Sequence, residues 1–276
     1  MKNLYGKVAV ITGAGSGIGR ALALQMAAAG AKLALNDWNA SALNDTLSML
    51  GKAEAWGQSF DVANREAVYA FAEEVLNRFG QVDIVVNNAG ITLEQRMLER
   101  TGYEDFERIV NVNMWGMIYG SKAFLPWLRQ RPEAALVNVS SIFGVVGYPN
   151  QGAYVTAKFA IRGFTETLRV ELAKTPVAVT CVHPGGIRTN IARNITSDNP
   201  KRVEKFAQVF EKMAITSAEE AARQIMEGIQ KKKKRVVIGP DARRLDWFAR
   251  LFPSAYERFV FKGYDVEKYS APEESR

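Results

Sequence analysis

The chain of 276 residues contains a single cysteine, Cys181, and a single histidine, His183. One cysteine cannot form a disulfide within the chain, which indicates a reducing compartment, and we expect a cytoplasmic protein. The two residues cannot supply the several ligands that a zinc site needs, so no metal site is predicted. A Ser-His-Asp hydrolase would depend on His183 alone, and the sequence has no G-x-S-x-G motif. Acid–base chemistry near neutral pH is therefore expected from a carboxylate, a tyrosine or a lysine.

Long hydrophobic runs and an N-terminal signal are also missing. No stretch of about 18 consecutive apolar residues is present to span a membrane, and Lys2 and Asn3 lead almost directly into a strand-like run. The net charge of +7 is uneven, because residues 231–276 hold 12 Lys/Arg and 7 Asp/Glu. A basic end can attract nucleic acid or anionic lipid. We favour a solvated charged face around residues 231–235 and expect no nucleic-acid partner, since the body has no basic stripe.

Apolar strands alternate with amphipathic helices along the chain. Strands are predicted at 7–12, 31–37, 54–62, 82–90, 134–141 and 177–186. Helices are predicted at 17–30, 39–50, 64–79, 103–130 and 152–173. Continuously apolar strands separated by helices indicate right-handed βαβ units and a parallel sheet covered on both faces. The predicted fold class is α/β, as one domain over 1–240 followed by a helical C-terminal extension over 241–276.

A glycine-rich turn, TGAGSGIG, joins the first predicted strand to the first predicted helix at residues 12–19. A helix N-terminus offers unpaired N–H groups and partial positive charge, and missing side chains let a pyrophosphate approach the backbone. The strict G-x-G-x-x-G spacing is absent because position 18 is Ile18, and the glycines are Gly13, Gly17 and Gly19. By itself, such a turn serves dinucleotide binding or tight packing about equally often.

Asp37 ends the second predicted strand, 18 residues after the last of these glycines. A carboxylate at this place accepts hydrogen bonds from the ribose hydroxyls of an adenosine and repels a 2′-phosphate. No basic residue attracts that phosphate at positions 16 and 38, which are Ser16 and Trp38. The prediction is NAD rather than NADP. The alternative is a turn or N-cap role for Asp37, although Asn39 is also available as a cap.

Taken together, the motifs over about residues 5–240 resemble the short-chain dehydrogenase/reductase family in order and spacing. They are the glycine turn, Asp61-Val62, the Asn-Asn-Ala-Gly strand end at 87–90, Asn113, Ser141, Tyr154-x-x-x-Lys158 and Pro184-Gly185-x-x-x-Thr189. The resemblance implies a Rossmann-type doubly wound sheet. It also implies an NAD(P)-dependent oxidoreductase that interconverts an alcohol with a ketone or aldehyde by hydride transfer. A homodimer or homotetramer is implied as well, with the helices around 103–130 and 152–173 at the interface.

The family's catalytic set corresponds to Asn113, Ser141, Tyr154 and Lys158. The resemblance implies that Tyr154 is the general acid/base, that Ser141 polarises the substrate oxygen and that Lys158 binds the nicotinamide ribose. Asn113 would hold a water that links Lys158 to solvent. Because Tyr154 and Lys158 share one helix face, we expect the ammonium to lower the phenol pKa from its ordinary value of about 10.

The resemblance also implies a path for the cofactor along the glycine turn and the strand ends. Its implied contacts are Gly13, Gly15, Ser16, Gly17, Ile18, Gly19, Asp37, Asp61, Val62, Asn88, Tyr154, Lys158, Pro184, Gly185, Ile187 and Thr189.

Several alternatives to these assignments stay open. Ser140 is the rival of Ser141, although a spacing of 13 residues before Tyr154 favours Ser141 and a shift by one residue reverses the face. Asp61 is also suited to capping the following helix, and His183 is interpreted as a strand-end residue near the cofactor. The pair of Tyr264 and Lys268 repeats the Y-x-x-x-K spacing without a preceding serine motif.

The segments 91–103, 143–151 and 190–215 are those in which substrate choice is expected, the last as a lid. Their apolar residues are Ile91, Leu93, Met97, Phe143, Val145, Val146, Tyr148, Ile191, Phe206, Val209, Phe210 and Met213. This composition favours a lipophilic small-molecule substrate, although ordinary packing of a lid explains it equally well.

Aromatic and basic residues alternate through residues 241–262. This segment covers the substrate pocket, packs on a partner subunit, or lies on a membrane surface as a basic amphipathic helix. We favour packing over membrane contact because amphipathic stripes mostly face protein cores. The rival function is a non-catalytic dinucleotide sensor or scaffold on the same fold. The intact catalytic set argues against it, since a sensor needs no acid–base group.

Overall fold

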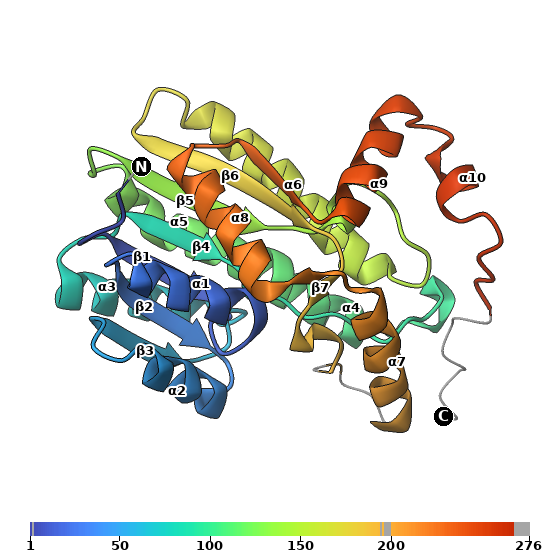
Figure 1. Ribbon diagram of the computed structural model, residues 1–276, viewed down its shortest axis with the longest axis horizontal. Helices are drawn as coiled ribbons and strands as arrows, with labels where there is room; N and C mark the ends of the chain where they lie inside the picture. The colour runs from blue at the N-terminus through green and yellow to red at the C-terminus, as the bar shows by residue number, and fades with distance from the viewer. Residues whose placement is uncertain (2, 194, 196–199, 268–276) are drawn as a thin grey trace.

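The computed structural model describes residues 1, 3–193, 195 and 200–267 of the chain. Seven strands form one sheet in the order β3-β2-β1-β4-β5-β6-β9 (Figure 1). They are β1 (Val8–Thr12), β2 (Lys32–Asp37), β3 (Ala55–Ser59), β4 (Ile84–Asn87), β5 (Ala134–Val139), β6 (Val177–Pro184) and β9 (Arg235–Ile238). Every neighbouring pair runs parallel, which confirms the prediction of a Rossmann-type, doubly wound α/β sheet in a single domain.

Helices cover both faces of this sheet. The helices α1 and α8 pack together on the near face in Figure 1, while α3, α5 and α6 cover the far face. The helices are α1 (Gly17–Ala28), α2 (Ala40–Met49), α3 (Arg65–Phe79), α4 (Tyr103–Val110), α5 (Gly116–Leu128), α6 (Gly152–Glu171), α7 (Pro200–Met213), α8 (Ala218–Gln230), α9 (Pro240–Leu251) and α10 (Tyr256–Val260). A second, two-stranded sheet pairs β7 (Ile187–Arg188) with β8 (Thr216–Ser217). None of the helices in the described part of the chain is long and apolar enough to cross a membrane.

Two hydrophobic clusters hold these layers together, one on each face of the sheet. Successive residues of a strand point to opposite faces. In β1, Val10 therefore joins the cluster that contains Phe71 of α3 and Phe124 of α5. Its neighbour Ile11 joins the cluster that contains Leu22 of α1. Burial on both faces explains why the strands are continuously apolar rather than alternating.

The structure differs from the predicted elements where a predicted helix is divided, and where elements were not predicted, namely α7, α8, β7, β8 and β9. The single helix predicted over 103–130 is divided, because a π-helical turn, η2 (Asn111–Trp115), separates α4 from α5. The strand β9 was not predicted, since its four residues directly follow a run of lysines. Those lysines, 231–234, are exposed as a charged face would be. Arg235 is different, because it begins β9 and pairs with Asp246 through two contacts of 2.7 Å.

A fully buried carboxylate, Asp83, ties the start of the sheet together. It accepts hydrogen bonds from the backbone N–H of Val8 at 3.0 Å and from the Gln81 side chain at 2.9 Å. It also pairs with Lys7 at 3.3 Å and with Arg131 at 3.0 Å. These partners compensate the desolvation of the carboxylate, which is otherwise expensive to bury.

We expect Asp83→Ala to lower the free energy of unfolding by about 3 kcal/mol, because it leaves the buried Val8 N–H without an acceptor and two cations without a counter-charge. Urea denaturation followed by circular dichroism measures the change. The control is Glu54→Ala, which removes a solvent-exposed pair with Lys32 and should change stability by less than about 1 kcal/mol. Equal losses in the two variants would contradict the role assigned to Asp83.

Candidate active site

The carboxyl ends of the parallel strands meet at one edge of the sheet, where strand order reverses between β1 and β4. Such a switch point leaves a crevice in which doubly wound proteins bind ligands. Most of the predicted site residues follow these strand ends. Gly13 comes after β1, Asp37 ends β2, Asn88 follows β4, Ser141 follows β5, and Pro184 ends β6.

The glycine turn fits a pyrophosphate by its backbone. Its N-cap residue, Ser16, makes no side-chain hydrogen bond to α1, and the first turn of α1 contains no acidic residue. The first N–H groups of the helix therefore keep their capacity to bind an anion. Gly13 and Gly17 have φ angles of 66° and 51°, which side chains disfavour. A Cβ on Gly13 would also lie 2.8 Å from the Ala89 backbone.

Asp37 is held by the turn beside it. Its carboxylate accepts hydrogen bonds from the backbone N–H groups of Gly15 at 2.8 Å and Asn39 at 2.9 Å, and the residue is only 8% exposed. Asn39, rather than Asp37, is the N-cap of α2. Arg20 binds the Gly15 carbonyl and the Thr46 hydroxyl. A carboxylate has about four acceptor sites, so Asp37 retains capacity for a ribose diol.

The Asp61-Val62 pair lies at the start of α3. The Asp61 carboxylate accepts a hydrogen bond from the Ala63 N–H at 2.9 Å, and the N-cap of α3 is Asn64. Asp61 therefore shapes the turn before the helix and does not cap the helix itself. Val62 is buried against Gly116 at the start of α5, where a Cβ would lie 2.7 Å from the valine side chain.

Ser140 and Ser141 face opposite ways, as neighbouring residues of an extended chain do. The Ser140 hydroxyl donates a 2.7 Å hydrogen bond to the Lys158 carbonyl and so packs β5 against α6. The Ser141 hydroxyl accepts from the Phe143 N–H at 3.1 Å and forms a side-chain hydrogen bond with Tyr154. Of the two serines, it is therefore Ser141 that lies beside Tyr154.

Tyr154 and Lys158 lie one turn apart on α6, with the Lys158 ammonium 5.4 Å from the centre of the Tyr154 ring. Lys158 is buried and donates a 3.2 Å hydrogen bond to the Val139 carbonyl. Burial lowers the pKa of Lys158 to about 8. Burial also raises the pKa of Tyr154 to about 12, although the hydrogen bond with Ser141 opposes this shift. The expected lowering of the phenol pKa is therefore wrong for this structure, because loss of hydration on burial outweighs the hydrogen bond with Ser141.

Asn113 lies in the π-helical turn and is buried. Its side-chain amide accepts from the Ile91 N–H at 2.8 Å and donates to the Ile91 carbonyl at 2.9 Å. A Cβ on Gly90 would lie 3.1 Å from the Asn113 oxygen and 3.3 Å from the Lys158 nitrogen. Because Gly90 has no side chain, the Asn113 oxygen and the Lys158 nitrogen can both lie close to its Cα. π-Helical turns are often found at functional sites.

The segment after β6 packs against the glycine turn. The Gly185 N–H donates to the Ile238 carbonyl at 2.9 Å, and Ile187 is buried in β7. Thr189 lies so close to Gly17 that a Cβ there would come within 2.9 Å of the threonine methyl group. The Asn88 amide donates to the Thr12 carbonyl at 2.9 Å and fixes the start of the glycine turn. The predicted contacts Asn88 and Thr189 therefore both lie against the glycine turn, at the carboxyl ends of the strands.

Comparison with known proteins agrees with this geometry. The sequence profile described as "short chain dehydrogenase" matches residues 7–200. The chain belongs to the short-chain dehydrogenase family. It is 47% identical over 269 residues to the putative oxidoreductase SadH of Mycobacterium tuberculosis, covering 95% of this chain and 97% of that protein. It is 34% identical over 284 residues to the uncharacterized oxidoreductase YxnA of Bacillus subtilis, and this match covers 99% of this chain and 78% of that protein.

A solved structure is also similar over the whole chain. It is a short-chain dehydrogenase/reductase from Burkholderia phymatum in complex with NAD. The TM-score is 0.85 at 28% sequence identity, and the match covers 100% of this chain and 99% of the other. The protein described here is therefore an oxidoreductase of the short-chain dehydrogenase family.

Two residues of this short-chain dehydrogenase contact the site in ways that the sequence motifs do not reveal. His183 is buried, which lowers its pKa to about 4, and its Nδ1 lies 3.0 Å from the Ser141 carbonyl. The neutral ring therefore donates to the backbone that carries the serine. Asp241 accepts a 2.7 Å hydrogen bond from the Gly186 N–H. The Pro240-Asp241 pair predicts the start of a helix but carries no sign of this long-range contact.

The C-terminal residues pack on the substrate side of the site. Tyr148 stacks on Phe143 at 4.4 Å and contacts the rings of Phe261 and Tyr264 at 5.6 and 6.0 Å. Phe143 in turn lies edge-on to Tyr154 at 6.5 Å. The C-terminal segment therefore packs on residues 143–148 of its own chain, one of the segments in which substrate choice is expected. Tyr264 belongs to this aromatic cluster, and Lys268 lies outside the described residues.

The predicted lid corresponds to α7 and the residues before it. Phe206 and Phe210 stack on each other at 6.4 Å along α7. The side chains of Val209 and Met213, and residues 194 and 196–199, lie outside the described part of the structure. Among the described residues, no group of three or more His, Cys, Asp or Glu side chains is placed to hold a metal ion.

We expect Lys158→Met to stabilise the protein by about 3 kcal/mol at pH 7. The folded-state pKa of about 8 lies below the ordinary 10.5 of lysine. The charged side chain therefore destabilises the fold at and below pH 8, and this penalty disappears as the pH rises toward 10.5. The stability gain of the variant should shrink over the same pH range.

Urea denaturation of both proteins between pH 7 and 10 measures this difference. The matched control is Lys52→Met, at an exposed position, which should leave the stability unchanged within about 0.5 kcal/mol. A Lys158→Met protein that is less stable than the wild type at pH 7 would show that the ammonium contributes favourable interactions in the folded state.

Proposed function

We propose that this protein is an NAD-dependent oxidoreductase that interconverts an alcohol with a ketone or aldehyde, acting on a lipophilic small molecule. The observation that carries the proposal is the convergence of Ser141, Tyr154 and Lys158 at the carboxyl ends of the strands, beside a glycine turn suited to a pyrophosphate. The nicotinamide would supply the acceptor or donor of a hydride. The protein would supply the binding, the orientation and the proton.

Tyr154 is proposed as the group that gives or takes this proton. In the direction of reduction, its hydroxyl donates to the substrate oxygen as negative charge develops there. Ser141, which is hydrogen-bonded to Tyr154, would donate to the same oxygen and polarise it. With a pKa of about 8, Lys158 is mostly protonated at pH 7 and places a positive charge near the phenolate that forms. Asn113 holds the Ile91 backbone beside these groups and is proposed to keep the proton path in place.

The preference for NAD rests on Asp37. Asp37 ends β2, and its carboxylate accepts a hydrogen bond from Gly15 of the glycine turn. The 2′-phosphate of an NADP bound along this turn would meet that negative charge. The Arg20 guanidinium already donates hydrogen bonds to the Gly15 carbonyl and the Thr46 hydroxyl, so we do not assign it to a 2′-phosphate. The similar Burkholderia phymatum protein was solved with NAD, which supports the same assignment here. The contacts predicted for the remaining cofactor-binding residues stay proposals.

A homo-oligomer is proposed from the outer faces of α5 and α6 and the turn that precedes α5. Trp115 and Phe159 are exposed there by 41% and 39%. Exposed aromatic residues on neighbouring helices favour burial against a second copy.

A lipophilic substrate is proposed because Phe143 and Tyr148 line the approach to Tyr154. A cytoplasmic location follows as a proposal from the single, buried cysteine.

The test of the proposed function is Tyr154→Phe. We expect turnover of a secondary alcohol or ketone, found by screening with NAD and NADP, to fall by at least about a thousandfold, because the variant lacks the proton-transferring group. NADH binding, measured by fluorescence titration, should stay within about threefold of the wild type. Full turnover in the variant would exclude Tyr154 as the acid. Tight NADH binding without turnover in the wild type would favour the sensor alternative.

The two serines provide a second, matched test. Ser141→Ala should lower kcat by about a hundredfold, because it removes a hydroxyl proposed to contact the substrate oxygen. Ser140→Ala should leave kcat within a few-fold and lower the free energy of unfolding by about 1 kcal/mol, since it removes the hydrogen bond to the Lys158 carbonyl. Turnover assays and urea denaturation on both variants separate the two effects. The reverse pattern would exchange the roles of the serines.

A further inference from the structure

The helix α9 has one face in contact with the protein. Ala242, Leu245 and Ala249 follow one another at helical spacing and join a cluster with Ile142 and Val146 beside the substrate side of the site. The same helix is fastened by Asp246, which pairs with Arg235 of β9 and with Arg250. The helix is therefore held firmly against the domain through one of its faces.

The opposite face of α9 is exposed and combines apolar with basic side chains. Trp247 and Leu251, four residues apart, are 58% and 52% exposed. Arg243, Arg244 and Arg250 begin on the same side of the helix and are also exposed, although the Arg243 guanidinium donates a hydrogen bond to Gln224 of α8 at 3.0 Å. Of the acidic residues of α9, Asp241 points to the domain, whereas Asp246 lies at the border of this face and pairs with both Arg235 and Arg250. We call this surface, made of Arg243, Arg244, Trp247, Arg250 and Leu251, the outer α9 face.

The position of this face suits docking on an extended surface. In Figure 1, α9 and α10 stand out from one corner of the molecule, beyond the edge of the sheet. Basic side chains continue past the helix, since Arg258 and Lys262 are exposed as well. The outer α9 face therefore belongs to an element at the periphery of the molecule.

We propose that the outer α9 face binds the surface of an anionic lipid bilayer. Tryptophan and leucine insert at the boundary between headgroups and acyl chains, while arginines beside them bind lipid phosphates. Pairing of this face with the same face of a second copy would bring the Arg243 and Arg244 side chains of both copies together, and among the described residues neither of these arginines forms a salt bridge, whereas Arg250 is paired with Asp246. A bilayer that contains acidic lipids supplies both the apolar layer and the negative charge.

Docking in this way would place the substrate side of the site next to the bilayer. The inner face of α9 contacts the segment that carries Phe143 and Val146, and Phe143 lies 6.5 Å from Tyr154. A lipophilic substrate dissolved in the membrane would then reach the site from the lipid. The docking itself requires no catalysis, so it does not depend on the proposed reaction.

The experiment is sedimentation of the full-length protein with vesicles. We expect binding to an equal mixture of phosphatidylcholine and phosphatidylglycerol, little binding to phosphatidylcholine alone, and weaker binding as salt is raised. Trp247→Ala combined with Leu251→Ala should lower the partition coefficient by about tenfold or more, since it removes the inserting side chains. Arg244→Gln should lower it by about fivefold, the effect of one basic residue at an anionic surface.

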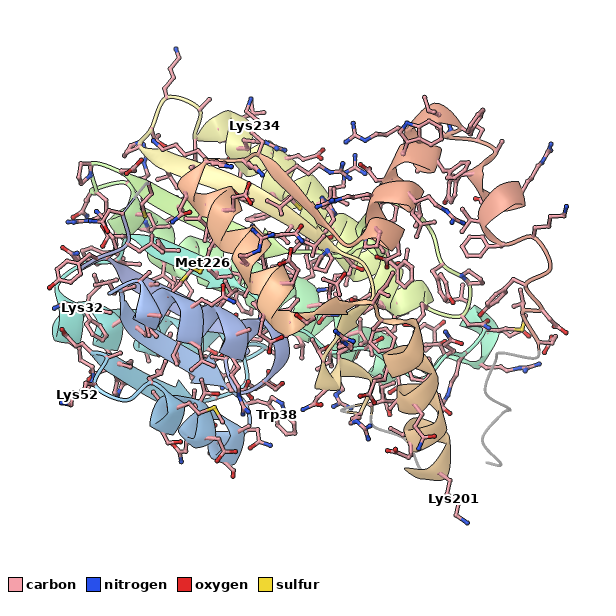
Figure 2. The ribbon with its side chains drawn as sticks, in the orientation of Figure 1. Lys32, Trp38, Lys52, Lys201, Met226 and Lys234 are labelled. Atoms are coloured by element: carbon pink, nitrogen blue, oxygen red, sulfur yellow. The ribbon has the colours of Figure 1, made fainter. Side chains whose placement is uncertain are left out.

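Matched controls remove exposed side chains elsewhere. Met49→Ala with Tyr69→Ala removes two exposed apolar residues, from α2 and α3, and Lys52→Gln removes a charge at the opposite end of the molecule from α9 (Figure 2). These variants should bind vesicles as the wild type does. Circular dichroism verifies that every variant folds. Tyr154→Phe should also bind as the wild type does, which separates this proposal from the proposed reaction.

Three outcomes would overturn the proposal. The first is the absence of wild-type binding to the acidic vesicles at low salt. The second is equal binding by the wild type and the variant that lacks Trp247 and Leu251. The third is dissociation of an oligomer by that double substitution, seen by light scattering, without vesicle binding by the wild type. That last result would assign the outer α9 face to contact between copies.

Discussion

The buried ammonium of Lys158 is the constraint on which the arrangement of the site depends. A charge removed from water is unfavourable unless other groups compensate it, and among the described residues the ammonium has one hydrogen-bond acceptor, the Val139 carbonyl. The pKa of Lys158 falls to about 8 as a result. The protein is therefore less stable than it would be with an uncharged side chain of similar size at position 158. Such a sacrifice is typical of sites in which a group is kept for chemistry rather than for packing.

The surrounding structure holds this lysine and its neighbours by backbone contacts rather than by salt bridges. Ser140 binds the Lys158 carbonyl, His183 binds the Ser141 carbonyl, and Asn113 binds both backbone groups of Ile91. Each contact joins two different elements: β6 with the end of β5 for His183, the end of β5 with α6 for Ser140, and the π-helical turn with the segment after β4 for Asn113. Because these bonds are neutral and buried, they fix positions without adding a charge that would alter the pKa values of the site.

Periodicity predicted the strands and helices of the sheet because it depends on local sequence, whereas the catalytic set was implied by the resemblance to the family. Apolar runs such as that of β1 mark strands, and the spacing of Tyr154 and Lys158 places them on one helix face. The rest depends on contacts that no local pattern encodes. The bond from Gly186 to Asp241 joins residues 55 positions apart. The phenol pKa was predicted in the wrong direction because the sequence shows the neighbouring charge and conceals the loss of hydration.

The C-terminal segment was ambiguous in sequence for a physical reason, since a helix with two apolar faces satisfies both packing and surface binding. In the structure the two requirements are divided between faces. Ala242, Leu245 and Ala249 are small or branched and meet the domain, whereas Trp247 and Leu251 face outward among arginines. A helix needed only for packing gains nothing from an exposed indole, and desolvating such a side chain is favourable. The outward tryptophan therefore calls for a partner surface, and the arginines around it set the charge which that surface must carry.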